Sequence, residues 1–185
     1  MSGFRKLESN IKNMMSVKHL VLGGARSGKS RYAQRLAENA GREVVYIATA
    51  SAGDAEMHAR IERHKQQRPN HWKLVEESIY LADVLRQQDA ANRIVLIDCL
   101  TLWLSNLLGK EDEALWMNEC NKLFAVLPQL HCDLIMVSNE VGQGIVPANA
   151  LARRFIDEAG WLHQRLAEIC NRVTFMLAGI PQTLK

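Results

Sequence analysis

The sequence predicts a layered α/β fold, in which helices flank a mostly parallel sheet, and three observations lead to this prediction. Short apolar runs of strand length alternate with segments whose apolar residues recur at helical spacing. The runs are continuous rather than alternating, which is typical of strands that are buried on both faces of a parallel sheet. The first run leads directly into a glycine-rich turn and then a helix. A chain of 185 residues is long enough for one domain of this kind.

The predicted elements follow one another along the whole chain. The first strand is expected to start at Lys18 and to include Leu20–Leu22, so residues 1–17 form an extension and residues 18–185 a single domain. The other predicted strands are Glu43–Ala48, Arg93–Ile97, Leu134–Ser138 and Val173–Ala178. The predicted helices are Ser30–Ala40, Asp54–Gln67, Tyr80–Ala90, a segment around Thr101–Leu108, Glu113–Leu127 and Asn149–Asn171. Trp72 and Glu76 fall in a short connecting stretch, where the tryptophan is expected to be a core residue.

The glycine-rich turn matches the pattern G-x-x-x-x-G-K-[ST], with Gly23, Gly28, Lys29 and Ser30 at the fixed positions. Glycines let successive backbone N–H groups curve around phosphate oxygens, and the next helix directs its positive end at the same anion. Lys29 is expected to reach the β- and γ-phosphates, and Ser30 to bind Mg²⁺. Because the strand and the helix that this motif requires are both present, we interpret the turn as a phosphate loop (P-loop).

Two acids follow apolar strands, at the sheet edge where a nucleotide is expected to bind. Asp98 ends the strand Arg93–Ile97, and in phosphate-loop enzymes an acid at this place holds Mg²⁺, usually through water. Glu140 has the same placement after Leu134–Ser138 and begins a loop with two glycines and a proline. Long, specialised loops of this kind usually line a site. Either acid is a candidate general base, and the pattern does not choose between them.

A histidine lies on the apolar face of the helix predicted at Asp54–Gln67. A histidine on an apolar helix face is more often a core residue than a catalyst, so the pattern alone favours a structural role for His64. Lys65 and Arg68 accompany it, however, and they could hold a phosphate beside the imidazole ring.

The composition is that of a globular protein, with 48% hydrophobic and 23% charged residues. A net charge of +3 with scattered basic residues gives no basis for a nucleic-acid partner. No stretch is long and apolar enough to span a membrane, and the start of the chain lacks a signal-peptide pattern. The four cysteines form no C-x-x-C pair, so we expect reduced thiols in a cytoplasmic protein.

Several blocks in a fixed order resemble the bifunctional adenosylcobinamide kinase / adenosylcobinamide-phosphate guanylyltransferase family of cobalamin biosynthesis. The resemblance extends from about Lys18 to Lys185. Its blocks are Gly23–Ser30; Tyr46–Thr49 with Glu56-Met57, Arg60-Ile61, His64, Arg68-Pro69 and Trp72; Asp98–Thr101 with Ser105–Leu108; Asn139–Gly142 with Gly144, Val146-Pro147, Arg154-Phe155, Asp157 and Gly160; and Gly179–Pro181. The family often has Asn-Gln where this chain has His163-Gln164, so the resemblance assigns position 163 no role.

This resemblance implies a RecA-like P-loop NTPase fold and two reactions at one nucleotide site. ATP or GTP would phosphorylate adenosylcobinamide. GTP would then transfer GMP to adenosylcobinamide phosphate through a GMP-histidine, releasing pyrophosphate and giving adenosylcobinamide-GDP. The matching histidine is His64, because the preceding position, a histidine in some members, is Arg63 here. The implied partners are these corrinoids and nucleotides, with Mg²⁺ as the cofactor and a homotrimer as the assembly.

The resemblance also implies a set of site residues. Lys29 would act in catalysis together with His64, and Ser30 and Asp98 would hold the metal, the latter through water. The implied nucleotide-binding residues are Gly23, Gly24, Ala25, Arg26, Ser27, Gly28, Lys29, Ser30, Ala48, Thr49, Ala50, Lys65, Gln66, Gln67, Arg68, Glu76 and Asp98.

Two other functions fit part of the pattern. A phosphate-loop kinase that acts on a small molecule without guanylyl transfer would need Lys29, Ser30 and Asp98 but not His64. A nucleotide-dependent regulatory NTPase would hydrolyse nucleotide without forming a covalent adduct, and it would bind no corrinoid. A switch GTPase usually carries an Asn-Lys-x-Asp guanine motif, which this sequence lacks.

Overall fold

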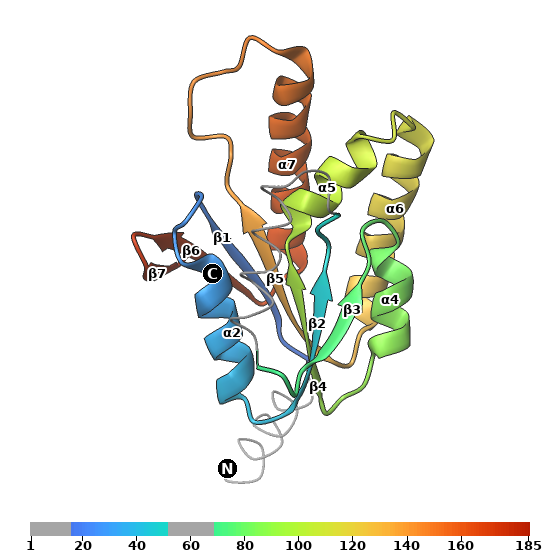
Figure 1. The fold of residues 1–185 in the computed structure, drawn as a ribbon, viewed down its shortest axis with the longest axis vertical. Coiled ribbons are helices and arrows are strands. Elements are labelled where there is room, and N and C mark those ends of the chain that lie inside the picture. The colour runs from blue at the N-terminus through green and yellow to red at the C-terminus, as the bar shows by residue number, and fades with distance from the viewer. Residues whose placement is uncertain (1–15, 52–68) are drawn as a thin grey trace, which may run out of the picture.

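The computed structural model describes residues 16–51 and 69–185 of the chain. A central sheet of seven strands has helices on its two faces (Figure 1). The strands are β1 (Lys18–Gly23), β2 (Glu43–Ala48), β3 (Lys73–Glu76), β4 (Arg93–Asp98), β5 (Asp133–Asn139), β6 (Arg172–Leu177) and β7 (Ile180–Thr183). The helices are α2 (Lys29–Asn39), α4 (Leu81–Gln88), α5 (Leu100–Leu108), α6 (Glu113–Val126) and α7 (Ala150–Ile169), with a 3₁₀ turn η1 (Leu127–Gln129) after α6. The helix predicted at Asp54–Gln67 and most of the predicted extension lie outside the described residues.

The strand order β3-β2-β4-β5-β1-β6-β7 places β1 between β5 and β6. Neighbouring strands are parallel except β6 and β7, which form an antiparallel hairpin. At the carboxyl end of β1, Gly23 is level with Asn139 of β5 and Met176 of β6. Because parallel strands end at the same edge of a sheet, the turns that follow β1, β4 and β5 meet there.

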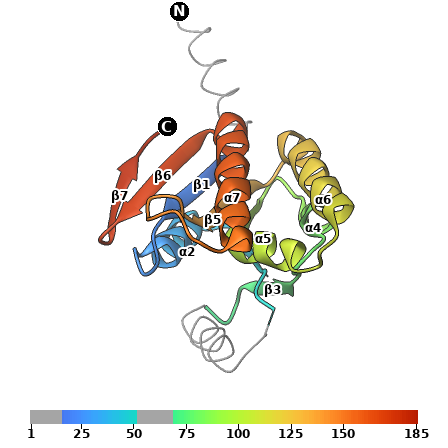
Figure 2. The same ribbon diagram turned by 90° about the horizontal axis from the view of Figure 1, so that it is seen from above.

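Apolar layers fill both sides of the sheet, as the continuous apolar runs predict. Helix α2 packs on one face, where its Ala33 and Ala37 join Val21 of β1 in one buried cluster. Helices α4 to α7 cover the other face, where Trp103 and Leu123 belong to the larger cluster. The view from above shows α2 and α7 on opposite sides of β1 and β5 (Figure 2). The packed core therefore fixes the positions of the strand ends, and loops form the edge of the sheet at which the parallel strands end.

The structure confirms the five predicted strands and, in its described part, five predicted helices. It also shows Trp72 to be buried, as predicted. The pattern does not predict β3 and β7, the strands at the two edges. Both have four residues with mostly exposed side chains, and β7 contains Pro181, which disfavours strands. They form because β2 and β6 each offer an open row of backbone groups, a cause that lies outside their own sequences.

In the described part of the chain, no helix combines the length and apolar character that crossing a membrane requires. The four cysteines are all free and buried. Burial raises the pKa of Cys120, Cys132 and Cys170 to about 12, so these thiols stay protonated and unreactive at neutral pH.

Candidate active site

The turn between β1 and α2 has the geometry of a phosphate-binding loop. Gly28 directly precedes α2 with φ 94°, a left-handed conformation that favours glycine. Its carbonyl accepts the N–H of Tyr32 at 2.9 Å, so the helix begins where the loop ends. The buried hydroxyl of Ser27 has no hydrogen-bond partner within residues 16–51 and 69–185. Because buried polar atoms are normally paired, this hydroxyl indicates a loop that is built to receive an anion.

Lys29 directs its ammonium group into this loop. The residue is 7% exposed, and Nζ donates a hydrogen bond to the carbonyl oxygen of Gly24 at 2.6 Å. Ala25 and Arg26 are exposed at the tip of the loop, and Ser30 is partly exposed in the first turn of α2. The positive charge is thus held beside the backbone N–H groups that would contact phosphate oxygens.

A hairpin from the far end of the chain supports the loop. The turn between β6 and β7 contains Ala178 and Gly179, both with positive φ, and the N–H of Gly179 donates to the carbonyl of Ser27 at 3.0 Å. A Cβ on Gly28 would lie 3.3 Å from the Cα of Gly179, so the two backbones pack closely. Sequence reasoning missed this contact. The available signal was Gly179 between two extended segments, because hairpin turns select glycine where φ is positive.

Substituting Gly23 by alanine is expected to lower the free energy of unfolding by about 1–3 kcal/mol, through crowding in a packed backbone. The new Cβ would lie 2.5 Å from the Met176 carbonyl oxygen and 2.8 Å from Ser27 Oγ, at a φ of 150°. Denaturant unfolding followed by circular dichroism measures the change. Gly24→Ala is the matched control, because a Cβ there meets nothing within 4 Å. Equal unfolding free energies for the two variants would contradict this explanation.

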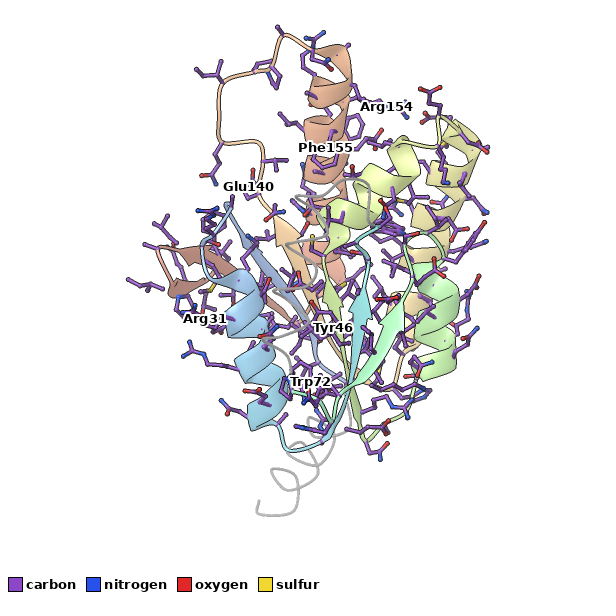
Figure 3. All side chains as sticks on the ribbon, viewed as in Figure 1. Arg31, Tyr46, Trp72, Glu140, Arg154 and Phe155 are labelled. Atoms are coloured by element: carbon purple, nitrogen blue, oxygen red, sulfur yellow. The ribbon has the colours of Figure 1, made fainter. Side chains whose placement is uncertain are left out.

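Asp98 stands at the carboxyl end of β4, at the same edge as the loop. Its Oδ2 accepts a hydrogen bond from the hydroxyl of Tyr46 at 3.1 Å, and the ring of Tyr46 lies 6.5 Å from that of Trp72 (Figure 3). Both rings belong to the cluster beneath α2, so the carboxylate is oriented from the core. A carboxylate and the hydroxyl of Ser30 are oxygen donors of the kind that Mg²⁺ prefers, so these residues fit a magnesium site.

The end of β2 meets two acids. Ala48 pairs with Asp98 of β4 on one side and with Glu76 of β3 on the other. Thr49 follows with its side chain fully buried. Its Oγ1 donates to the carbonyl of Cys99 at 2.6 Å and accepts the N–H of Cys99 at 2.9 Å. This hydroxyl therefore joins the two strand ends. Ala50, the next predicted site residue, is partly exposed beyond it.

The structure brings the phosphate loop, Glu76, Asp98 and Glu140 to one edge of the sheet. Glu140 is directly beside the loop, because its N–H donates to the carbonyl of Gly23 at 3.0 Å. The predicted nucleophile His64 and its neighbours 65–68 lie outside the described residues, so their placement stays a prediction. The described part of the site can therefore bind a nucleoside triphosphate and place its phosphates at a helix N-terminus.

Comparisons with known proteins identify the family of this chain. The family model described as "Cobinamide kinase / cobinamide phosphate guanyltransferase" matches residues 19–184. The bifunctional adenosylcobalamin biosynthesis protein CobP of Pseudomonas aeruginosa is 53% identical over 169 residues, which cover 91% of this chain and 98% of the relative. The bifunctional adenosylcobalamin biosynthesis protein CobU of Escherichia coli is 41% identical over 179 residues, covering 90% of this chain and 98% of the relative.

A solved structure gives an independent comparison of the fold. The crystal structure of the RadB recombinase superposes with a TM-score of 0.52 at 16% sequence identity, covering 86% of this chain and 73% of that chain. This likeness concerns the fold alone, and it supports the predicted RecA-like P-loop NTPase architecture. From the family match and the close relatives, we conclude that the chain belongs to the cobinamide kinase / cobinamide phosphate guanyltransferase family.

Proposed function

We propose that this protein phosphorylates adenosylcobinamide with ATP or GTP and then transfers GMP from GTP to the product, giving adenosylcobinamide-GDP and pyrophosphate. The observation that carries the proposal is the family match over residues 19–184, in a chain whose phosphate loop stands at the sheet edge. The relatives CobP and CobU are named as bifunctional adenosylcobalamin biosynthesis proteins, which fits two activities in one chain.

The kinase step needs little from the protein beyond positioning and charge. A substrate hydroxyl attacks the γ-phosphorus, and the new O–P bond forms as the bond to the bridging oxygen breaks and the nucleoside diphosphate leaves. The loop N–H groups and the ammonium of Lys29 stabilise the charge on the phosphates. Ser30 and Asp98 are the residues that would hold Mg²⁺, which neutralises phosphate charge when it is bound.

The guanylyl step uses a covalent intermediate in this proposal. A neutral imidazole nitrogen of His64 attacks the α-phosphorus of GTP, and pyrophosphate leaves with the electron pair of the broken P–O bond. A phosphate oxygen of adenosylcobinamide phosphate then attacks the same phosphorus. The P–N bond breaks, and the imidazole is released. Lys65–Arg68, Glu76 and the segment Ala48–Ala50 complete the proposed guanine-nucleotide site.

The assembly is a further part of the proposal. We propose a homotrimer that works in the cytoplasm, on the family resemblance. Analytical ultracentrifugation tests the assembly, and the expected mass is three times that of the 20.9 kDa chain.

Product analysis tests the two activities. Purified protein is incubated with Mg²⁺ and adenosylcobinamide, in one reaction with ATP and in another with GTP, and the corrinoids are identified by mass spectrometry. We expect only adenosylcobinamide phosphate with ATP, and adenosylcobinamide-GDP with release of pyrophosphate when GTP is present. Phosphorylation without any GDP product would indicate a plain phosphate-loop kinase. Nucleotide hydrolysis with an unchanged corrinoid would indicate a regulatory NTPase.

A further inference from the structure

A buried polar cluster lies behind the end of β5, on the face of the sheet that α5 and α7 cover. It consists of Thr101 from α5, Ser138 from β5, His163 from α7, and Glu140, which follows β5. Thr101, Ser138 and His163 are at most 7% exposed, whereas the Glu140 side chain is 23% exposed. Figure 3 shows Glu140 at the edge of the sheet where β5 ends. The cluster thus runs from the interior to a carboxylate that reaches solvent.

Hydrogen bonds connect the buried members in one line. The N–H of Asn139 donates to Thr101 Oγ1 at 2.7 Å, Thr101 Oγ1 lies 3.3 Å from Ser138 Oγ, and Ser138 Oγ lies 2.7 Å from His163 Nε2. The other ring nitrogen, Nδ1, lies 3.9 Å from Glu140 Oε2. Burial lowers the pKa of His163, although the charge of Glu140 opposes the effect, so the ring is neutral at pH 7.

One arrangement of protons suits every atom in this line. If the Thr101 hydroxyl donates to Ser138 and the Ser138 hydroxyl donates to Nε2, then Nδ1 of His163 carries the ring proton. That N–H then faces the Glu140 carboxylate and attracts it. The opposite tautomer would turn a nitrogen lone pair toward a negative oxygen. The network therefore presents a neutral N–H dipole that orients Glu140 without neutralising its charge.

Glu140 is held beside the phosphate loop by its own backbone. Its N–H donates to the carbonyl of Gly23, and its Oε1 accepts the N–H of Gly142 at 2.5 Å. A groove of about 640 Å³ is lined by residues of α5, the loop after β5 and the start of α7, among them Ser105, Phe155 and Val141, the residue that follows Glu140. Residues 140 and 141 therefore connect the loop that would bind the phosphates to a groove that is large enough to receive part of an acceptor.

We propose that Glu140 is the general base of the kinase step and that His163 is its positioning residue. The inference rests on the proposed kinase activity. Glu140 accepts the proton of the substrate hydroxyl as that oxygen bonds to the γ-phosphorus, and the proton later passes to water. The nucleoside diphosphate leaves with the electrons of the broken P–O bond. Asp98 is less suited, because its carboxylate accepts the Tyr46 hydroxyl and is the candidate ligand for the metal.

The two activities of the proposed enzyme provide an internal control. The kinase acceptor is a hydroxyl, which must lose a proton, whereas the guanylyl acceptor is a phosphate that is already ionised. Glu140→Gln keeps the size of the side chain and one acceptor oxygen for the N–H of Gly142, but it removes the base. We expect its kcat for adenosylcobinamide phosphorylation to fall by about 10²–10⁴-fold. Its rate of guanylyl transfer to supplied adenosylcobinamide phosphate should stay within a factor of about three of wild type, which is far less than the effect of a lost base.

Matched variants complete the test. Glu168→Gln makes the same change at an exposed position near the end of α7 and should alter neither rate. His163→Leu should lower the kinase kcat by about 10–100-fold through misplacement of Glu140. His163→Gln, which retains a donor and an acceptor, should restore part of that loss. Guanylyl transfer should be unaffected in both.

Three results would overturn the assignment. They are an unchanged kinase rate in Glu140→Gln, an equal fall of both activities in that variant, or an equal fall of both in His163→Leu. A wild-type protein that phosphorylates no corrinoid would instead contradict the proposed function, so the two failures are distinguishable.

Discussion

Replacing Lys29 by methionine is expected to lower both adenosylcobinamide phosphorylation and guanylyl transfer by about 10³-fold, because one charged donor that stabilises the transition state is lost. The ammonium lies in the loop at 2.6 Å from the Gly24 carbonyl, and the residue is almost fully buried. A charge in such a site is poorly screened, and in the proposed function it would contact the phosphates in both reactions. Methionine keeps the unbranched stem, so packing around the loop is conserved.

Steady-state kinetics with saturating corrinoid measure this effect, and thermal unfolding checks that the variant is folded. Arg35→Met is the matched control, because Arg35 is an exposed cation on the same helix. It should retain both rates. Near-normal activity of Lys29→Met in either reaction would mean that this reaction does not use the phosphate loop, and the single nucleotide site would have to be abandoned.

Replacing His64 by alanine is expected to abolish the GMP adduct and guanylyl transfer while phosphorylation of adenosylcobinamide continues. In the proposed mechanism only the guanylyl step forms a bond to the imidazole, whereas the kinase step transfers the γ-phosphoryl group directly to the acceptor. Intact-mass measurement after incubation with Mg²⁺ and GTP should show one added GMP on the wild type and none on the variant. The adduct should survive base and be lost in acid, as a phosphoramidate is.

His71→Ala controls for the loss of a histidine in the same part of the chain, because His71 is exposed. It should form the adduct normally. An adduct that persists in His64→Ala would place the nucleophile elsewhere. The absence of any adduct on the wild type, together with intact nucleotide binding, would remove the covalent mechanism and leave a plain kinase or an NTPase.

The three variants are expected to lose different activities, which would separate the two reactions. Lys29→Met should lose both activities, His64→Ala only guanylyl transfer, and Glu140→Gln only phosphorylation. A pattern of this kind cannot arise from general instability, because misfolding lowers both activities together.

Local sequence patterns were sufficient to predict the elements that carry their own signal. The phosphate loop could be predicted because one short segment supplies strand, turn, Lys29 and helix together. The central strands could be predicted because burial on both faces requires continuous apolar runs. The placement of Asp98 at a strand end followed from the same runs, and the structure confirms it.

The remaining features depend on partners that are distant in sequence. The edge strands β3 and β7 form because β2 and β6 pair with them, and their own sequences carry little strand signal. The support of the loop by Gly179 joins residues that are more than 150 positions apart, because β6 lies beside β1. The resemblance implies that Thr49 contacts the nucleotide, and the structure shows its buried hydroxyl bonded to the backbone of Cys99 across two strand ends.

The sequence by itself determined the fold class, the phosphate loop and the family, because these depend on apolar periodicity and on motifs of adjacent residues. Only the tertiary structure decided which groups surround His163. Along the chain it is one histidine in a long helix, but the packing of α7 on the sheet brings its ring to Ser138 and Glu140. The physical reason is that a side chain's pKa, tautomer and partners are set by the groups around it in space. For His163 those groups come from α5, β5 and the loop beyond it.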